Sequence, residues 1–422
     1  MTYWFTDPQF KNLMPLAGAK AIRGLSTTFS VPTIVMGANA LPEGSGLGQS
    51  LIDRLALRCD RRRAFIVTDE NGVNHAARVA RALEKGRFTT ETWSKILPEP
   101  PVENVKECAE SMKQFEPDVI VAIGGGSVMD GAKVAWILYE RPDITNLATL
   151  SPIRPLGLRK KAFLVAFPTT SGTGSECTQV AVVSDVAAKR KLPILSPELM
   201  PDFAVLLPDF TMGMPPKLTA GTGLDALAHA MDNVASYPSI EICDALALKA
   251  IEMIFKYLPR AYRYPRDREA RLRMHIAATM AGIAFSQGGI AVTHSLGHAV
   301  GKLFSVHHGI AVGILIPYAY QFYAPISDKY LAVCKALDVD GASAEKKLDA
   351  LLTRVRGLLA ELDVPTDFKG LGIPREEFEA NFDTLALSSF EDPSNFQSVR
   401  PPTLEQCKKL LWCAYEGKDV DF

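Results

Sequence analysis

The chain has 422 residues, more than a single hydrophobic core usually organises, so we expect two domains. Its 46 Lys and Arg residues nearly balance 47 Asp and Glu residues, so the chain lacks the basic field through which proteins bind nucleic-acid phosphates. The seven cysteines are dispersed and never spaced as Cys-x-x-Cys, and no apolar run reaches the length of a membrane span. We therefore expect a cytoplasmic protein with no nucleic-acid or membrane partner.

The first half of the chain alternates short apolar runs with amphipathic segments. The apolar runs, rich in Val and Ile as buried parallel strands are, lie at residues 32–37, 64–69, 119–127 and 162–170. Residues 74–85 and 102–115 carry apolar side chains at intervals of three and four residues, which is typical of helices packed on a sheet. This alternation predicts a doubly wound, Rossmann-like parallel sheet that binds ligands beyond the carboxyl ends of its strands.

Polar loops follow three of these predicted strands. Gly124–Gly126 and Ser127 join a strand to a helix, where they either admit an anionic pyrophosphate to the backbone N–H groups or form only a tight turn capped by the serine. The loop at 168–176 offers hydroxyl and N–H groups that suit a diphosphate and a carboxamide-bearing ring. Asp69 ends another strand, where its carboxylate can bind a ribose diol and repel a 2′-phosphate; as an alternative or in parallel, it caps the next helix.

The second half of the chain differs in composition and contains long segments rich in Ala, Leu and Met. Helices are predicted at residues 222–236, 239–258, 268–286, 344–362 and 403–415. We therefore expect an α/β dinucleotide-binding domain at residues 1–210 and an all-α domain at residues 211–422.

Ligand-type residues recur at helical spacing in the second half. Asp225 and His229 are four residues apart, as are His294 and His298, so each pair lies on one face of a helix. A lone Asp-x3-His pair is usually a buried polar pair, but four of the seven histidines fall between residues 294 and 308. Because carboxylate and imidazole ligands suit Zn²⁺ or Fe²⁺, we predict one divalent metal site.

Taken together and in this order, the motifs resemble those of the iron-containing (group III) alcohol dehydrogenases. The resemblance is carried by GGGSVMD (124–130), FPTTSGTGSE (167–176), MPPKLTAGTGLDALAHA (214–230), AGIAFSQ (281–287) and the histidines through HHG (307–309). It implies an NAD-dependent enzyme that interconverts an alcohol and an aldehyde or ketone, with Fe²⁺, or alternatively Zn²⁺, polarising the substrate oxygen. We expect a small-molecule substrate and a homo-oligomer.

The resemblance also implies roles for individual residues. It places the metal ligands at Asp225, His229, His294 and His308, with His307 as an additional neighbour, and a proton relay at His298. It places cofactor contacts at Asp69, Gly125, Gly126, Ser127, Asp130, Thr169, Thr170, Thr173, Thr178 and Lys191, and Asp69 at the position associated with NAD preference.

Three other functions stay open at this point. A hydroxyacid–oxoacid transhydrogenase and a lyase of the dehydroquinate synthase type would each recycle NAD internally. A metal-binding or filament-forming protein without catalysis would bind the same groups and turn nothing over.

Overall fold

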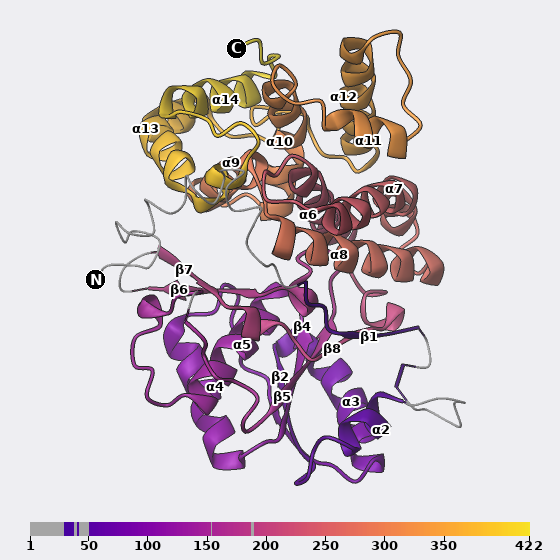
Figure 1. Cartoon of the computed structure of the whole chain (residues 1–422), viewed down its shortest axis with the longest axis vertical. Coiled ribbons are helices and arrows are strands. Elements are labelled where there is room, and N and C mark those ends of the chain that lie inside the picture. Colours follow the sequence, from indigo (N-terminus) through magenta and orange to yellow (C-terminus); the bar gives the residue numbers. More distant parts are fainter. Residues whose placement is uncertain (1–28, 38–39, 42–49, 153, 187–189) are drawn as a thin grey trace. The chain divides into compact units, whose positions relative to one another are not determined.

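The structure is a computed structural model that describes residues 29–37, 40–41, 50–152, 154–186 and 190–422. These residues form two compact units, one ending at Gly213 and the other running from Met214 to Phe422. The first unit contains a six-stranded parallel sheet, and the second is helical (Figure 1). The predicted fold class, an α/β part followed by an all-helical part, is confirmed.

The sheet brings the carboxyl ends of its central strands together. Its strands, in spatial order, are β1 (Thr33–Met36), β8 (Phe203–Leu206), β5 (Phe163–Pro168), β4 (Val119–Gly124), β2 (Arg63–Thr68) and β3 (Thr89–Trp93). The chain passes from β2 to β3 on one side and then to β4 on the other, so β2 and β4 flank a topological switch point. Thr68 pairs with Ile123, and Gly124 pairs with Pro168, so the loops that follow these strands start side by side.

Helices cover both faces of this sheet. They are α2 (Leu51–Ala56), α3 (Val73–Lys85), α4 (Val102–Phe115) and α5 (Gly126–Glu140). Along β2, Phe65 and Val67 pack with α4 and α5, whereas Ala64 and Ile66 pack with α2 and α3. Since both faces are covered, all six residues of β4 are buried, which explains why the strand reads as one apolar run.

Two strands of the sheet were not predicted: β3, which lacks such a run, and β8, whose buried apolar run FAVL was overlooked. The edge strand β3 reads TTETW and is mostly exposed, and β8 has only four residues. An antiparallel hairpin, β6 (Val180–Asp185) and β7 (Arg190–Leu195), follows the second predicted loop. By contrast, the apolar runs predicted as strands correspond to β1, β2, β4 and β5.

The second unit consists of helices around a buried central one. They are α6 (Pro216–Val234), α7 (Glu241–Arg263), α8 (Arg268–Gly288), α9 (Val292–Leu303), α10 (His308–Tyr323), α11 (Tyr330–Ala336), α12 (Ala344–Glu361), α13 (Arg375–Glu391) and α14 (Leu404–Glu416). Helix α6 contacts α7, α8, α9 and α10, and every residue from Thr219 to Val234 is buried (Figure 1). Helix α9 was expected only through the spacing of His294 and His298, and α10 was not predicted, because it is apolar on nearly all sides and has no amphipathic pattern.

Among the described residues, no single helix is long and apolar enough to cross a bilayer. Helices α8 and α9, which meet at a bend of 108°, have the length and composition of a membrane span only when taken as a pair.

Candidate functional site

Four ligand-type side chains meet inside the helical unit, although they come from three helices. Asp225 and His229 lie one turn apart on α6, His294 is on α9, and His308 is the first residue of α10. Asp225 Oδ1 lies 4.0 Å from His229 Nε2, 3.9 Å from His294 Nε2 and 3.2 Å from His308 Nε2. Ligand atoms held about 2.0–2.2 Å from one tetrahedral ion are roughly 3.4 Å apart, so the cluster has the size of a single-ion site.

Two polar atoms at the centre of this cluster are buried and form no hydrogen bond of normal geometry with the described residues. In the part of the chain that the structure describes, Asp225 Oδ1 and His294 Nε2 accept no hydrogen bond. Leaving a buried polar atom unpaired costs roughly 1–3 kcal/mol, so such atoms are rare unless a ligand satisfies them. One carboxylate and three imidazoles are a donor set that binds Fe²⁺ or Zn²⁺, and these residues therefore fit a divalent metal.

Electrostatics in the cluster favour the protonation states that metal ligands require. Burial opposes ionisation of the Asp225 carboxyl, but the imidazoles of His229, His308 and His294 outweigh burial and lower its pKa. Burial also lowers the pKa of His229 to about 3, against the opposing effect of Asp225. An ionised carboxylate and a neutral imidazole are the forms that bind a cation.

His298 lies beside the cluster and faces solvent. Its ring centroid is 5.8 Å from that of His294 and 5.1 Å from that of His308. Its side chain is 43% exposed, compared with 1% for His294, and its Nδ1 lies 2.9 Å from Asp392 Oδ2. The arrangement connects the edge of the cluster to bulk water.

His307 occupies a different place from His308. Its ring lies against the backbone of α6, because a Cβ added at Gly221 would be 2.5 Å from it. Within the described residues, the histidine nitrogens within 4.0 Å of Asp225 Oδ1 belong to His229, His294 and His308 but not to His307.

Sequence reasoning missed Asp232, a fully buried carboxylate behind the cluster. Its Oδ2 lies 2.8 Å from His294 Nδ1 and accepts hydrogen bonds from the backbone N–H groups of Ala291 and His294. Residues 225, 229 and 232 follow the i, i+4, i+7 spacing of one helix face, and that spacing was the available signal.

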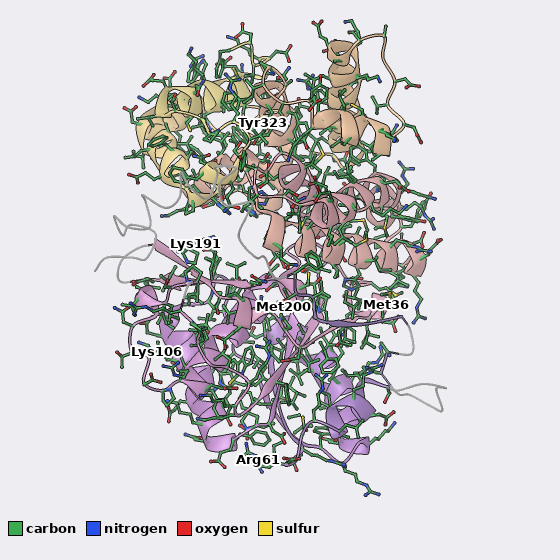
Figure 2. The ribbon with its side chains drawn as sticks, in the orientation of Figure 1. Met36, Arg61, Lys106, Lys191, Met200 and Tyr323 are labelled. Carbon is green, nitrogen blue, oxygen red and sulfur yellow. The ribbon has the colours of Figure 1, made fainter. Side chains whose placement is uncertain are left out.

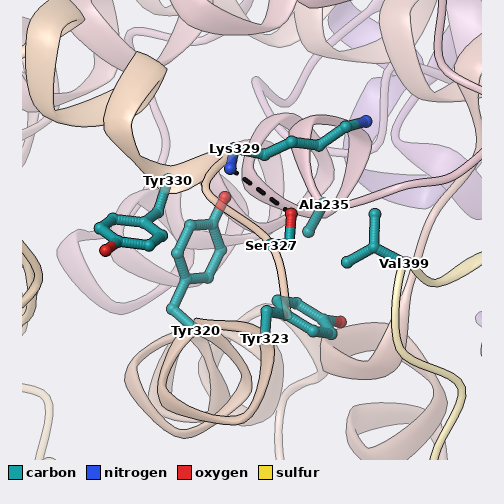
Figure 3. A pocket seen from close by; sticks show the side chains of 7 residues that line it. All are labelled: Ala235, Tyr320, Tyr323, Ser327, Lys329, Tyr330 and Val399. Carbon is teal, nitrogen blue, oxygen red and sulfur yellow. Dashed lines mark hydrogen bonds between the residues drawn. The ribbon is translucent and has the colours of Figure 1, made fainter. Parts of the chain in front are cut away.

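A small cavity also lies in the helical unit (Figure 3). It is lined by Ala235, Tyr320, Tyr323, Ser327, Lys329, Tyr330 and Val399. None of the four ligand-type residues lines this cavity, so it is separate from the cluster.

In the first unit, the two predicted cofactor loops lie against each other. The N-cap of α5 is Gly125, which has no side chain to cap the helix, and Ser127 lies inside the first turn and accepts a hydrogen bond from Glu99 N–H. The capping role considered for Ser127 is therefore wrong. A Cβ at Gly125 would be 3.5 Å from Thr170, and one at Gly126 would be 3.0 Å from Thr173. The uncapped N–H groups at the start of α5 suit an anion.

Two of the predicted cofactor residues are engaged by the protein itself. Asp130 Oδ1 accepts a hydrogen bond from Ser175 Oγ at 2.7 Å, and its Oδ2 accepts one from Val182 N–H at 2.9 Å. Thr178 is buried, and both its carbonyl oxygen and its hydroxyl bind Lys133 Nζ. Asp130 and Thr178 thus hold the second loop against α5.

Lys133 was not singled out from the sequence, yet it is fully buried on α5. Its ammonium group lies 3.1 Å from Ser175 Oγ, 3.0 Å from both Thr178 oxygens and 2.9 Å from the Val180 carbonyl oxygen. A lone lysine within the apolar run 132–139 was the only signal in the sequence.

Three further predicted cofactor residues, Asp69, Lys191 and Thr169, each have a partner within this unit. Asp69 Oδ1 accepts a hydrogen bond from Gly72 N–H at 2.8 Å, so the helix-capping alternative is realised with one of its oxygens. Lys191, on β7, is exposed and pairs with Glu99 at 2.8 Å (Figure 2). Thr169 N–H donates to the Gly124 carbonyl oxygen at 2.9 Å, which ties the second loop to the first.

A doubly wound unit with a glycine loop at its switch point, together with a helical unit holding an Asp–His cluster, is the arrangement expected of an enzyme that uses a nucleotide cofactor and a metal ion. Residues 42–208 match the family model described as iron-containing alcohol dehydrogenase, and residues 219–415 match that of the Fe-containing alcohol dehydrogenase family, C-terminal. The chain belongs to the iron-containing alcohol dehydrogenase family.

Similar proteins support the same activity. The NADPH-dependent butanol dehydrogenase of Clostridium saccharobutylicum is 38% identical over 328 residues, which are 78% of this chain and 84% of that protein. The bifunctional aldehyde-alcohol dehydrogenase AdhE of Escherichia coli K12 is 35% identical over 85% of this chain, which spans only 43% of that longer protein. Sulfoacetaldehyde reductase from Bifidobacterium kashiwanohense, solved in complex with NAD+, has 25% identity and a TM-score of 0.78, covering 93% of this chain and 99% of its own.

The chain is therefore an oxidoreductase that interconverts an alcohol and a carbonyl compound. The transhydrogenase and lyase alternatives are not supported, since the relatives are alcohol dehydrogenases.

Proposed function

We propose that Asp225, His229, His294 and His308 bind one divalent metal ion, Fe²⁺ in keeping with the family's description and Zn²⁺ as the alternative. The observation that carries this proposal is the pair of buried, unpartnered atoms Asp225 Oδ1 and His294 Nε2, 3.9 Å apart. The lowered pKa values of Asp225 and His229 support it, because both side chains are then in their metal-binding forms at neutral pH.

We further propose that NAD binds the first unit at the carboxyl ends of β2, β4 and β5. The proposed contacts are Asp69, Gly125, Gly126, Ser127, Asp130, Thr169, Thr170, Thr173, Thr178 and Lys191. The uncapped start of α5 supports a pyrophosphate site there. The Asp69 carboxylate favours NAD over NADP, since it would repel a 2′-phosphate. Because the Clostridium relative is an NADPH-dependent enzyme, the test below compares NAD with NADP.

In the proposed reaction, His298 and Asp392 handle the proton, and the bound metal and cofactor act on the substrate. When bound, the metal would polarise the substrate oxygen, and the nicotinamide would exchange the hydride. His298 moves the proton between the substrate and solvent, for which its 43% exposure is suitable. The Asp392 carboxylate at its Nδ1 holds the tautomer in which Nε2 accepts that proton.

The wider setting is also proposed. We place the cofactor domain at residues 1–210 and the metal domain at residues 211–422, and we expect a homo-oligomer acting on a small alcohol or aldehyde. All seven cysteines are free and six are buried, which supports a reducing, cytoplasmic location.

The test is NADH absorbance with metal-depleted protein resupplied anaerobically with Fe²⁺ or Zn²⁺. The protein receives NAD or NADP and a panel of primary alcohols, diols and hydroxy acids. We expect NADH formation only after metal is restored, and none from the Asp225→Asn variant. Equal turnover by the metal-free protein would refute the proposed metal role.

A further inference from the structure

The buried carboxylate of Asp232 makes three contacts with a single oxygen. Oδ2 lies 3.0 Å from Ala291 N, 3.1 Å from His294 N and 2.8 Å from His294 Nδ1. The side chain is 0% exposed, and its Oδ1 has no partner among the described residues. Asp232 therefore holds both the first turn of α9 and the ring of its histidine.

These contacts determine which nitrogen of His294 carries the proton. Two backbone N–H groups already donate to Oδ2, and an ionised carboxylate oxygen only accepts hydrogen bonds. The third contact then requires a proton on Nδ1 of His294. Its Nε2 is left with a lone pair, and this is the atom that lies 3.9 Å from Asp225 Oδ1. The ring is thus fixed in the tautomer that binds a metal through Nε2.

Neighbouring groups reinforce the same geometry. Tyr323 Oη accepts a hydrogen bond from Val292 N–H at 3.0 Å, and Tyr320 Oη donates to the Met231 carbonyl oxygen at 2.8 Å. These bonds fix the start of α9 and the end of α6, the two segments that Asp232 joins. His229 is held differently, by stacking on Phe285 with ring centroids 4.0 Å apart, and its Nδ1 has no partner in the described chain.

In the described part of the chain, no positively charged side chain compensates the negative charge of Asp232. Among the described residues Asp232 contacts the ring of His294, which is neutral in this tautomer, and no Lys or Arg pairs with Asp232. Burying an ionised carboxylate is unfavourable unless a cation compensates it. The carboxylates of Asp225 and Asp232 together balance the two charges of a divalent ion, because the imidazole ligands are neutral.

We propose that Asp232 is a positioning residue of the metal site: it fixes the tautomer and orientation of His294 and supplies the second negative charge that a divalent cation requires. This inference rests on the proposed ligand set and adds a residue to it.

The test measures metal affinity directly, with Co²⁺ as the probe. Wild type, Asp232→Asn and Asp232→Ser are titrated with Co²⁺ in competition with a chelator, and the visible absorption of the bound ion is recorded. We expect the Co²⁺ dissociation constant to rise about 10–100-fold in both variants, with a changed absorption spectrum. Asparagine keeps an oxygen that can accept from the two backbone N–H groups but removes the charge, whereas serine removes the charge and is too short to reach His294 Nδ1, and the Tm of each variant without metal shows whether it folds.

Asp118→Asn is the matched control. Asp118 is another buried carboxylate, and it accepts three backbone N–H groups, those of Arg61, Arg62 and Arg63, in the other unit. We expect Asp118→Asn to lower stability and leave Co²⁺ binding unchanged. The metal-induced rise in Tm should shrink in Asp232→Asn but not in the control.

The direct ligand variant Asp225→Asn separates the two proposals. If Asp225→Asn loses Co²⁺ while both Asp232 variants bind it as wild type does, the inference about Asp232 is wrong and the ligand set stands. If Asp225→Asn also binds Co²⁺ normally, the ligand set itself is wrong and this inference falls with it.

Discussion

Replacing Lys133 with methionine should loosen the loop that follows β5. Methionine has a similar length and flexibility, but it donates no hydrogen bond. The change removes the donor for the Thr178 and Val180 carbonyl oxygens and for the hydroxyls of Ser175 and Thr178, all within 3.1 Å. A buried acceptor that loses its donor costs roughly 1–3 kcal/mol. Removing a buried ammonium group offsets part of this, so we expect a net local loss of about 2–4 kcal/mol.

Hydrogen–deuterium exchange at residues 175–182 measures this loss where it occurs. A loss of about 2 kcal/mol corresponds to exchange roughly 30-fold faster. Val182 N–H is a sensitive reporter, because it donates to Asp130 across the same contact. Since this loop also carries the proposed NAD contacts, the dissociation constant of NAD, measured by calorimetry, should rise about tenfold.

Lys113→Met is the control for the loss of a lysine from this unit. Lys113 is 40% exposed on α4, where it pairs with Glu110. It should change neither exchange at residues 175–182 nor NAD binding. Unchanged exchange in Lys133→Met would refute the argument, and faster exchange with unchanged NAD affinity would limit Lys133 to a structural role.

The same lysine gives a pH prediction. Burial lowers the pKa of Lys133 to about 8, against 10.5 as its ordinary value. Because its folded-state pKa is below the unfolded one, burying the charged form costs stability below pH 8, and this cost is relieved as the pH rises toward 10.5. The stability of the wild type relative to Lys133→Met should therefore increase over that range. If the difference in the free energy of unfolding between wild type and Lys133→Met stays constant or decreases over this range, burial does not lower the pKa of Lys133 as argued.

The other variants probe the cofactor site and the proton relay. Asp69→Ser keeps an oxygen that caps Gly72 but removes the charge, so kcat/KM for NADP relative to NAD should rise at least about tenfold; an unchanged ratio would exclude Asp69 as the discriminating group. His298→Gln should retain the metal, measured by elemental analysis, while kcat falls about 100-fold, and normal turnover would exclude the relay. Gly126→Val adds a branched side chain where even an added Cβ would lie only 3.0 Å from Thr173. We expect NAD to bind at least about tenfold more weakly by calorimetry, with the metal content unchanged.

The sequence by itself determined the features that depend on local pattern. Strands buried on both faces must be apolar throughout, so β2, β4 and β5 were visible as runs of Val, Ile, Ala and Phe. Residues four apart share a helix face, so the pairs Asp225–His229 and His294–His298 were visible as candidate ligands. Glycines and hydroxyls at strand ends marked the loops for the same local reason.

Only the tertiary structure decided which of these residues meet and which atoms they use. Packing of α9 and α10 on α6 brings His294 and His308 within 4 Å of Asp225, and no local pattern specifies that contact. Asp130 accepts hydrogen bonds from Ser175 and Val182, which lie 45 and 52 residues further along the chain. Asp232 likewise contacts the ring of His294, which lies 62 residues further along. Such contacts depend on the directions of side chains and on the distances between helices and strands. The spacing of residues within one segment of the chain specifies neither.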